Sequence, residues 1–135
     1  NDPGQRLVAA AVEAGHGVVP IPGPSAVAAA LSISGFTGDG YVFLGYLPRK
    51  PGELRKLFES LATEARPAVA FDSPYRILKS LSALAEILPD RRLMVGRELT
   101  KLHEQVVRGT PGEALDALAT KAKGEFTLVI AGCPS

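Results

Sequence analysis

The sequence predicts an α/β domain of three layers, in which helices flank a mixed, mostly central β-sheet of about five strands. Two observations lead to this prediction. First, short apolar runs rich in β-branched residues alternate with segments whose apolar residues recur at helical spacing. Second, two of the β-type runs, residues 92–98 and 105–108, are close enough in sequence to form a hairpin, so the sheet is expected to be mixed rather than purely parallel.

The composition is typical of one globular domain with a core. The chain has 135 residues, of which 46% are hydrophobic and 21% charged, and this balance argues against disorder. There is no run of about 18 apolar residues and no signal peptide, so no membrane association is expected. The single cysteine, Cys133, fits a reducing, cytoplasmic location. The formal net charge of +1 gives no overall attraction to nucleic acid, which leaves local basic patches.

The first part of the chain predicts a helix, a strand and a second helix. Asp2 suits the N-cap and Pro3 the first position of the first helix. Residues 17–21 form a short β-type run, and a turn of prolines and glycine separates it from a small-residue helix at residues 25–34. Because the chain opens at Asn1, without a methionine and at a helix start, we expect it to be a piece of a longer protein.

The middle of the chain alternates strand and helix twice. Residues 41–47 and 68–72 have the aromatic, branched and small apolar residues of strands. Pro51 opens the helix after the first strand, and Ser73 and Pro74 suit the cap and first position of the helix after the second. The apolar stripes of these helices comprise Leu54, Leu57, Phe58 and Leu61, and then Ile77, Leu81, Leu84 and Leu88.

The last part predicts the hairpin, a third amphipathic helix and a closing strand. The segment TPGE at residues 110–113 is a capping box, with Thr110 as the N-cap and Glu113 three positions later. The helix that it opens is expected to end near Gly124. Residues 126–131 then form a final buried strand.

Four junctions between these elements are candidate ligand sites: residues 22–26, 71–76, 97–104 and 131–132. In open α/β sheets, ligands bind where strands end and helices begin. At the first junction, PIPGPSA, a helix N-terminus beside a glycine suits an anionic group, and the alternative is a simple connector.

The other junctions also leave two interpretations open. Asp72 and Arg76 in FDSPYR can bind a ligand or form a local cap and surface ion pair. RELTKLHEQVVRG, residues 97–109, can serve a ligand or be a solvated hairpin. RKPGELRK, residues 49–56, can meet an RNA backbone or be a solvated helix face. The cysteine and histidines lack metal-ligand spacing, so no metal is expected.

Six motifs in order carry a family resemblance: DPGQRLV, VVPIPGPSA, FLGYLPRK, FDSPYR, GRELTKLHEQVVRG and GEFTLVIAG. Over essentially the whole chain they resemble the second domain of the tetrapyrrole methylase superfamily. Within it they are most similar to the branch that methylates the ribose 2′-hydroxyl of a cytidine in small-subunit ribosomal RNA. The resemblance implies that residues 1–135 are a single domain, the C-terminal half of a two-domain methyltransferase whose N-terminal domain lies upstream.

The same resemblance implies the ligands and partners. S-adenosylmethionine is expected between the two domains, small-subunit ribosomal RNA or the ribosomal subunit as substrate, and a homodimer as the assembly. This chain alone is expected to fold, to bind the cofactor weakly and to be inactive. Carried over motif by motif, the cofactor contacts fall at Ser25, Ala26, Phe71, Asp72, Leu99, Thr100 and Ala131.

The resemblance does not identify a catalytic base. A ribose hydroxyl is a weak nucleophile, so a base or charged neighbour should assist it; the candidates are Glu98, Lys101, His103 and Glu104. The cations expected on RNA phosphates are Arg49, Lys50, Arg76, Arg97 and Lys101. FDSPYR departs from the family pattern, with Asp72 in place of glutamate and Tyr75 in place of histidine.

Two other functions stay open at this point. One is a precorrin-type tetrapyrrole carbon methyltransferase of the same superfamily. The other is a non-catalytic α/β binding or dimerisation module.

Overall fold

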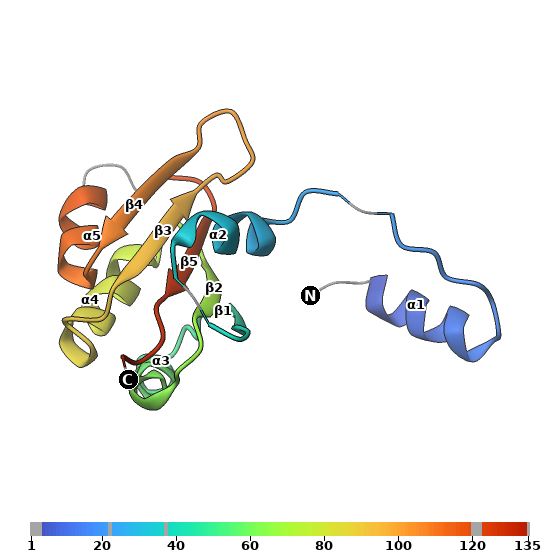
Figure 1. The fold of residues 1–135 in the computed structure, drawn as a ribbon, viewed down its shortest axis with the longest axis horizontal. Helices are drawn as coiled ribbons and strands as arrows, with labels where there is room; N and C mark the ends of the chain where they lie inside the picture. The colour runs from blue at the N-terminus through green and yellow to red at the C-terminus, as the bar shows by residue number, and fades with distance from the viewer. Residues whose placement is uncertain (1–3, 22, 37, 120–122, 135) are drawn as a thin grey trace.

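The computed structural model describes residues 4–21, 23–36, 38–119 and 123–134. Within them it confirms the α/β architecture with one mixed sheet, whose strand order is β1-β2-β5-β3-β4 (Figure 1). The strands are β1 (Val42–Tyr46), β2 (Ala68–Asp72), β3 (Leu93–Arg97), β4 (Gln105–Gly109) and β5 (Phe126–Ile130). The helices are α1 (Gly4–Glu13), α2 (Ala26–Ser34), α3 (Pro51–Ser60), α4 (Ile77–Ile87) and α5 (Pro111–Leu118), with a 3₁₀ turn, η1 (Leu61–Thr63).

The strand directions bring the ends of three strands together at one end of the sheet. β1 and β2 are parallel, whereas β5 runs antiparallel to both β2 and β3, and β4 runs antiparallel to β3. β1, β2 and β3 therefore finish at the same end of the sheet, where β5 and β4 begin. We call this end the site edge; it is marked by the paired residues Asp72, Phe126 and Arg97.

Helices cover both faces of the sheet, as predicted. One core cluster packs α3, α4 and α5 on one face, and a second packs α2 on the other (Figure 1). The alternating side chains of β5 explain why there are two core clusters, because successive side chains of a strand point to opposite faces. Phe126, Leu128 and Ile130 belong to the first cluster, and Val129 belongs to the second.

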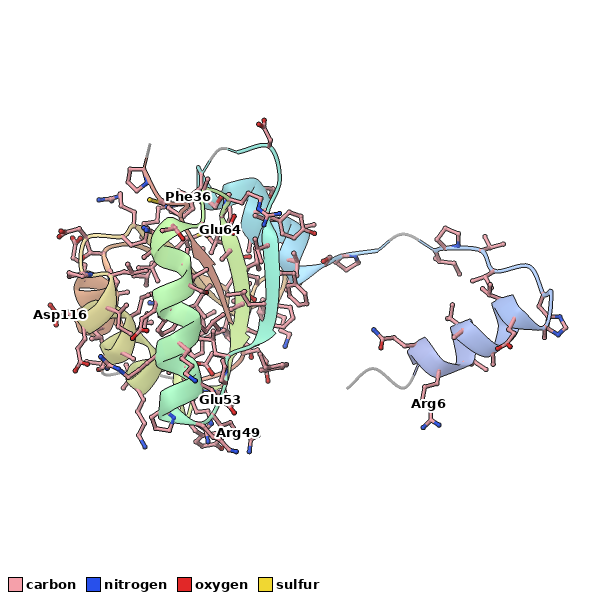
Figure 2. All side chains as sticks on the ribbon, turned by 90° about the horizontal axis from the view of Figure 1, so that it is seen from below. Arg6, Phe36, Arg49, Glu53, Glu64 and Asp116 are labelled. Carbon is pink, nitrogen blue, oxygen red and sulfur yellow. The ribbon has the colours of Figure 1, made fainter. Side chains whose placement is uncertain are left out.

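The predicted strand at residues 17–21 is wrong. The segment belongs to no strand, and Val19 and Ile21 are 82% and 92% exposed. The preceding helix, α1, forms as predicted but has no buried residue, and its Leu7 is 73% exposed. Figures 1 and 2 show α1 and this segment lying apart from the body of the molecule. A strand needs a neighbour to pair with, and none of the described strands lies beside this segment.

The predicted start of α4 is also wrong by about one turn. Residues 73–76 form a turn in which the backbone N–H of Arg76 donates to the Ser73 carbonyl (3.1 Å), and the helix begins at Ile77. The hairpin of β3 and β4 and the capping box at Thr110 are confirmed. In the described part of the chain, every helix falls short of the length and apolarity that a bilayer crossing requires.

Candidate functional site

A cleft of about 310 Å³ opens at the site edge, on the face of the sheet that carries α2. We call it the α2-side cleft. Its walls come from the start of α2, the ends of β1 and β2, the turn after β3 and the start of β5. The lining residues are Ala26, Tyr46, Phe71, Glu98, Leu99, Thr100, Lys101, Glu125, Phe126 and Thr127.

The start of α2 lies against this cleft. Ser25 has extended backbone angles and caps the helix, because its side chain accepts a hydrogen bond from the backbone N–H of Ala28 (3.4 Å). Ala26 follows as the first helical residue and lines the cleft with a methyl group only. The hydroxyl of Ser25 is therefore used in capping, while Ala26 leaves room for a ligand.

The end of β2 sends two neighbouring side chains to opposite faces. Phe71 lines the cleft and packs edge-on against the rings of Phe43 and Tyr46, with centroids 5.4 and 5.6 Å away. Asp72 points to the other face, is 2% exposed, and accepts hydrogen bonds from the Ser80 hydroxyl (2.6 Å) and the Ser73 backbone N–H (3.0 Å). The Asp72 carboxylate therefore does not line the cleft, because strand alternation turns it toward α4.

Burial determines the electrostatics of Asp72. Removal from water raises the pKa of this carboxyl, because a desolvated carboxylate is disfavoured. The hydrogen bonds from Ser80 and Ser73 and the charge of Arg76 act in the opposite direction. Asp72 is thus a buried acid that joins β2 to α4.

The turn after β3 forms the floor of the cleft and is conformationally strained. Glu98 and Thr100 have positive φ angles of 51° and 68°, a region that non-glycine residues seldom adopt and that is associated with functional sites. Leu99, between them, folds back over Gly96: a Cβ atom on Gly96 would lie 2.7 Å from Leu99 Cγ. Gly96 therefore allows the turn to close, and the sequence analysis had not identified it.

Charged groups of the same turn lie at the mouth of the cleft. Lys101 Nζ and Glu98 Oε2 are 2.9 Å apart. The hydrogen bond from Lys101 is the main cause that lowers the pKa of Glu98, and the same bond raises the pKa of Lys101. Glu104 accepts a hydrogen bond from the Thr100 backbone N–H (3.1 Å) and so closes the turn, and His103 is exposed and does not line the cleft. Of the four catalytic candidates, Glu98 and Lys101 line the cleft.

The opposite wall of the cleft contains a hydrogen-bonded pair, Tyr46 and Glu125, that the sequence does not predict. The Tyr46 hydroxyl donates a hydrogen bond to Glu125 Oε2 (3.2 Å). The charge of Glu125 is the main cause that raises the pKa of Tyr46, so this phenol keeps its proton. Tyr46 and Thr127 lie beside Phe71 in the sheet, one on each neighbouring strand. Only the strand register brings them together, and that register is not visible in the sequence.

Ala131 lies at the other end of the sheet. It follows the last residue of β5, Ile130, which pairs with Ala68 and Leu93 at the starts of β2 and β3. Its carbonyl accepts a hydrogen bond from the buried Arg91 guanidinium (3.3 Å). The expectation that Ala131 joins Ala26, Phe71 and Leu99 in one wall is wrong, because β5 is antiparallel to its neighbours.

The predicted RNA-contacting cations are divided among three places. Lys101 lies at the cleft. Arg49 and Arg76 line a second cavity, on the face covered by α3 and α4, and Lys50 is exposed beside it as the N-cap residue of α3. Arg97 is half-buried: its Nη1 donates to the Lys123 carbonyl (3.5 Å), and its buried Nε has no partner among the described atoms.

The α2-side cleft combines surfaces that suit a nucleoside. The Phe71 ring, Leu99 and Ala26 make an apolar wall for a flat base, and the carboxylates of Glu98 and Glu125 provide acceptors for ribose hydroxyls. Except for Ser25, Asp72 and Ala131, the predicted cofactor contacts line this cleft.

Comparison with known proteins identifies the family of this chain. The profile of the family Tetrapyrrole (Corrin/Porphyrin) Methylases matches residues 1–115. A "Ribosomal RNA small subunit methyltransferase I" of Neisseria meningitidis serogroup B is 46% identical over 132 residues, which are 96% of this chain and 45% of that protein. The protein of the same name from a Synechocystis species is 47% identical, over 98% of this chain and 48% of its own length.

Solved structures share the fold at low sequence identity. A cobalt precorrin-4 methyltransferase has a TM-score of 0.64 and 16% identity, and the match covers 94% of this chain and 57% of that one. A uroporphyrin-III C-methyltransferase from Thermus thermophilus, complexed with S-adenyl homocysteine, has a TM-score of 0.59 and 15% identity over 95% of this chain and 58% of that one.

The chain thus spans about half the length of the curated relatives it matches. The family profile covers most of its residues, and the relatives align over almost all of them. The chain belongs to the tetrapyrrole (corrin/porphyrin) methylase family.

Proposed function

We propose that the whole protein is an S-adenosylmethionine-dependent methyltransferase that acts on the ribose 2′-hydroxyl of a cytidine in small-subunit ribosomal RNA. The observation that carries this proposal is the α2-side cleft, where Ala26, Phe71 and Leu99 come together from three separate motifs. The relatives quoted above, both named as small-subunit rRNA methyltransferases, favour RNA over a tetrapyrrole as the substrate.

The cleft residues suit the nucleoside part of this cofactor. Phe71 and Leu99 would flank the adenine, and Ala26 would leave space beside the ribose. Thr100 lies next to them and would contribute its backbone carbonyl, since its N–H is bound to Glu104. When bound, S-adenosylmethionine supplies an electrophilic methyl group.

Glu98 and Lys101 are the residues of this chain best placed to assist the target hydroxyl. The low pKa of Glu98 keeps it ionised at neutral pH, so its carboxylate accepts a hydrogen bond. The same low pKa makes it a weak proton acceptor. We therefore assign Glu98 to orienting the hydroxyl and Lys101 to holding Glu98, because much of the rate can come from fixed geometry.

We also propose how this chain sits in the whole protein. Residues 1–135 form the C-terminal half, and the exposed apolar residues of α1 and of residues 17–21 pack against an upstream domain that closes the cleft. The assembly is a homodimer in the cytoplasm, where its RNA substrate is found. Arg49, Lys50, Arg76, Arg97 and Lys101 serve as RNA-contacting cations.

A substitution that fills the cleft tests the proposal in the full-length protein. Ala26→Phe should lower the affinity for S-adenosylmethionine in isothermal titration at least about tenfold, which is ~1.4 kcal/mol. Ala28→Phe is the matched control, because Ala28 is an exposed residue of the same helix and does not line the cleft. Transfer of a labelled methyl group to the cytidine ribose of small ribosomal subunits should fall in parallel.

Three results would contradict the proposal. The first is that the full-length protein binds no S-adenosylmethionine, the second is that the two variants bind it equally, and the third is that the label appears only on a tetrapyrrole. The 135-residue chain alone should bind the cofactor more weakly than the full-length protein, because half of the cleft is missing.

A further inference from the structure

A second cavity lies at the site edge, on the face opposite to the α2-side cleft. It has a volume of about 140 Å³ and lies between the starts of α3 and α4, so we call it the α3–α4 cavity. One water needs only about 10–15 Å³ of cavity volume, so the cavity accommodates a group of several heavy atoms. Figure 2 shows Arg49 at the same end of α3 as Glu53, with Glu64 at the far end.

The lining of this cavity is strongly basic. Its polar side chains are Arg49, Arg55, Arg76, Lys79 and Ser80, and no carboxylate is among the lining residues. Arg55 is neutralised by Glu86, at 2.7 Å. Among the described residues, the side-chain nitrogens of the other three cations lie beyond 4.0 Å from any carboxylate oxygen. The lining of the cavity therefore carries a net positive charge, and the acid behind it is the buried Asp72, on which the charge of Arg76 acts.

The walls of the cavity are held in place by the fold. Arg76 Nη1 donates a hydrogen bond to the Arg49 carbonyl (3.3 Å), which ties the loop after β1 to the start of α4. Pro48 and Pro51 line the cavity and restrict the same loop. Ser80 is buried at the back of the cavity, where it donates to Asp72 and so occupies that carboxylate.

The helix starts beside the cavity lack acidic caps. The N-cap residues of α3 and α4 are Lys50 and Arg76, and neither provides a side-chain acceptor for the first turn. The start of α3 has a partial positive charge from its N–H groups, which Glu53 in the first turn offsets in part. At the start of α4 the N–H groups of Arg76 and Ile77 are bound to the Ser73 carbonyl. The cationic side chains therefore converge on one partly enclosed volume at the start of α3, and this combination suits a phosphate.

We propose that the α3–α4 cavity binds one backbone phosphate of the RNA substrate, close in sequence to the nucleotide that is methylated. This inference rests on the function proposed above. Tyr46 lines the α2-side cleft and Arg49, three residues later, lines the cavity, so their Cα atoms lie within about 11 Å. An RNA strand that places its ribose at the cleft thus reaches the cavity around the site edge within a few nucleotides.

The test uses the full-length protein and an oligoribonucleotide of the small-subunit target sequence, with one phosphate at a time replaced by a neutral methylphosphonate. For the unmodified protein, replacement at one linkage should lower the affinity at least about tenfold, because a charge-assisted contact is lost. Arg76→Ala should lower the affinity for the unmodified RNA similarly and should be insensitive to replacement at that linkage.

Lys56→Ala is the matched control. Lys56 is another exposed cation of α3, but it does not line the cavity. Arg76→Ala and Lys79→Ala should each reduce the slope of log affinity against log salt by about 0.7, the value for one contact to a single strand. Lys56→Ala should still lose affinity when the sensitive linkage is replaced. Affinity for S-adenosylmethionine should stay unchanged in all three variants, because the cofactor cleft is on the opposite face.

The proposal is overturned if no linkage is sensitive, if Arg76→Ala keeps the same linkage penalty, or if a polyglutamate peptide binds the cavity and RNA does not. If Arg76→Ala fails to fold, Arg76→Lys and the scan on the unmodified protein decide the question. Absence of rRNA methylation by the unmodified protein contradicts the proposed function instead, so the two failures are distinguishable.

Discussion

Two adjacent residues at the end of β2 show how a single position determines a role. Phe71 faces the α2-side cleft and Asp72 faces α4, although the sequence motif that contains them suggested that both meet the ligand. The buried Asp72 carboxyl has a raised pKa because it is desolvated, and two hydrogen bonds compensate in part. The role of Asp72 in this motif is therefore to join β2 to α4.

This burial leads to a pH-dependent prediction for Asp72→Asn. An acid with a raised pKa binds more protons in the folded state, so its contribution to stability falls as pH rises above its ordinary value of 3.8. Asparagine keeps one oxygen acceptor for the Ser73 N–H, its amide N–H donates to the Ser80 hydroxyl in place of the present bond, and it does not titrate. The free energy of unfolding of the variant minus that of the wild type should therefore increase with pH across this window, as measured by urea unfolding at several pH values. Because all other acids are shared, a difference that is constant or decreasing with pH would contradict the assignment.

At the scale of an element, α5 is the helix whose start was most fully predicted. Thr110 Oγ1 accepts a hydrogen bond from the Glu113 backbone N–H (3.3 Å), and Glu113 Oε1 accepts one from the Thr110 backbone N–H (3.0 Å). The start of α4 was predicted less well, because Asp72 caps the turn at Ser73 and the helix begins only at Ile77. Caps made by local side chains are visible in sequence, whereas this turn depends on a contact between a strand and a helix.

The capping box predicts the effect of substitution at Thr110. Thr110→Ala should lower the free energy of unfolding by about 1 kcal/mol, because it leaves a helix N–H without its side-chain acceptor. Thr110→Ser keeps the hydroxyl and should retain most of that stability. Urea unfolding followed by circular dichroism measures both variants, and equal losses would show that the hydroxyl is not the stabilising group.

At the scale of the molecule, the chain divides into a packed body and a separate N-terminal unit. The body buries β5 completely, whereas α1 buries none of its residues. The apolar spacing of α1 correctly predicted a helix with a face to bury, but it does not tell which surface covers that face. The same reason explains the wrong prediction at residues 17–21, where a strand-like pattern has no strand beside it.

Hydrogen exchange should reveal this division. A helix of ten residues without tertiary contacts is marginal in water, so α1 amides of the 135-residue chain should exchange within about tenfold of the rate of an unstructured peptide. The amides of β5 should be the most protected, since they open only with the whole body. In the full-length protein, protection of α1 should rise. Equal protection of α1 and β5 in the short chain would contradict the separation.

The sequence by itself determined the α/β class, the order of most elements, the family and the motifs that meet at the α2-side cleft, because periodicity, caps and turn residues are local signals. Only the tertiary structure decided that β5 runs antiparallel in the middle of the sheet. That direction removes Ala131 from the site and brings Glu125 and Thr127 into it. The basic cavity between α3 and α4 likewise exists only in the folded chain, since its cations come from elements that pack together through a shared core.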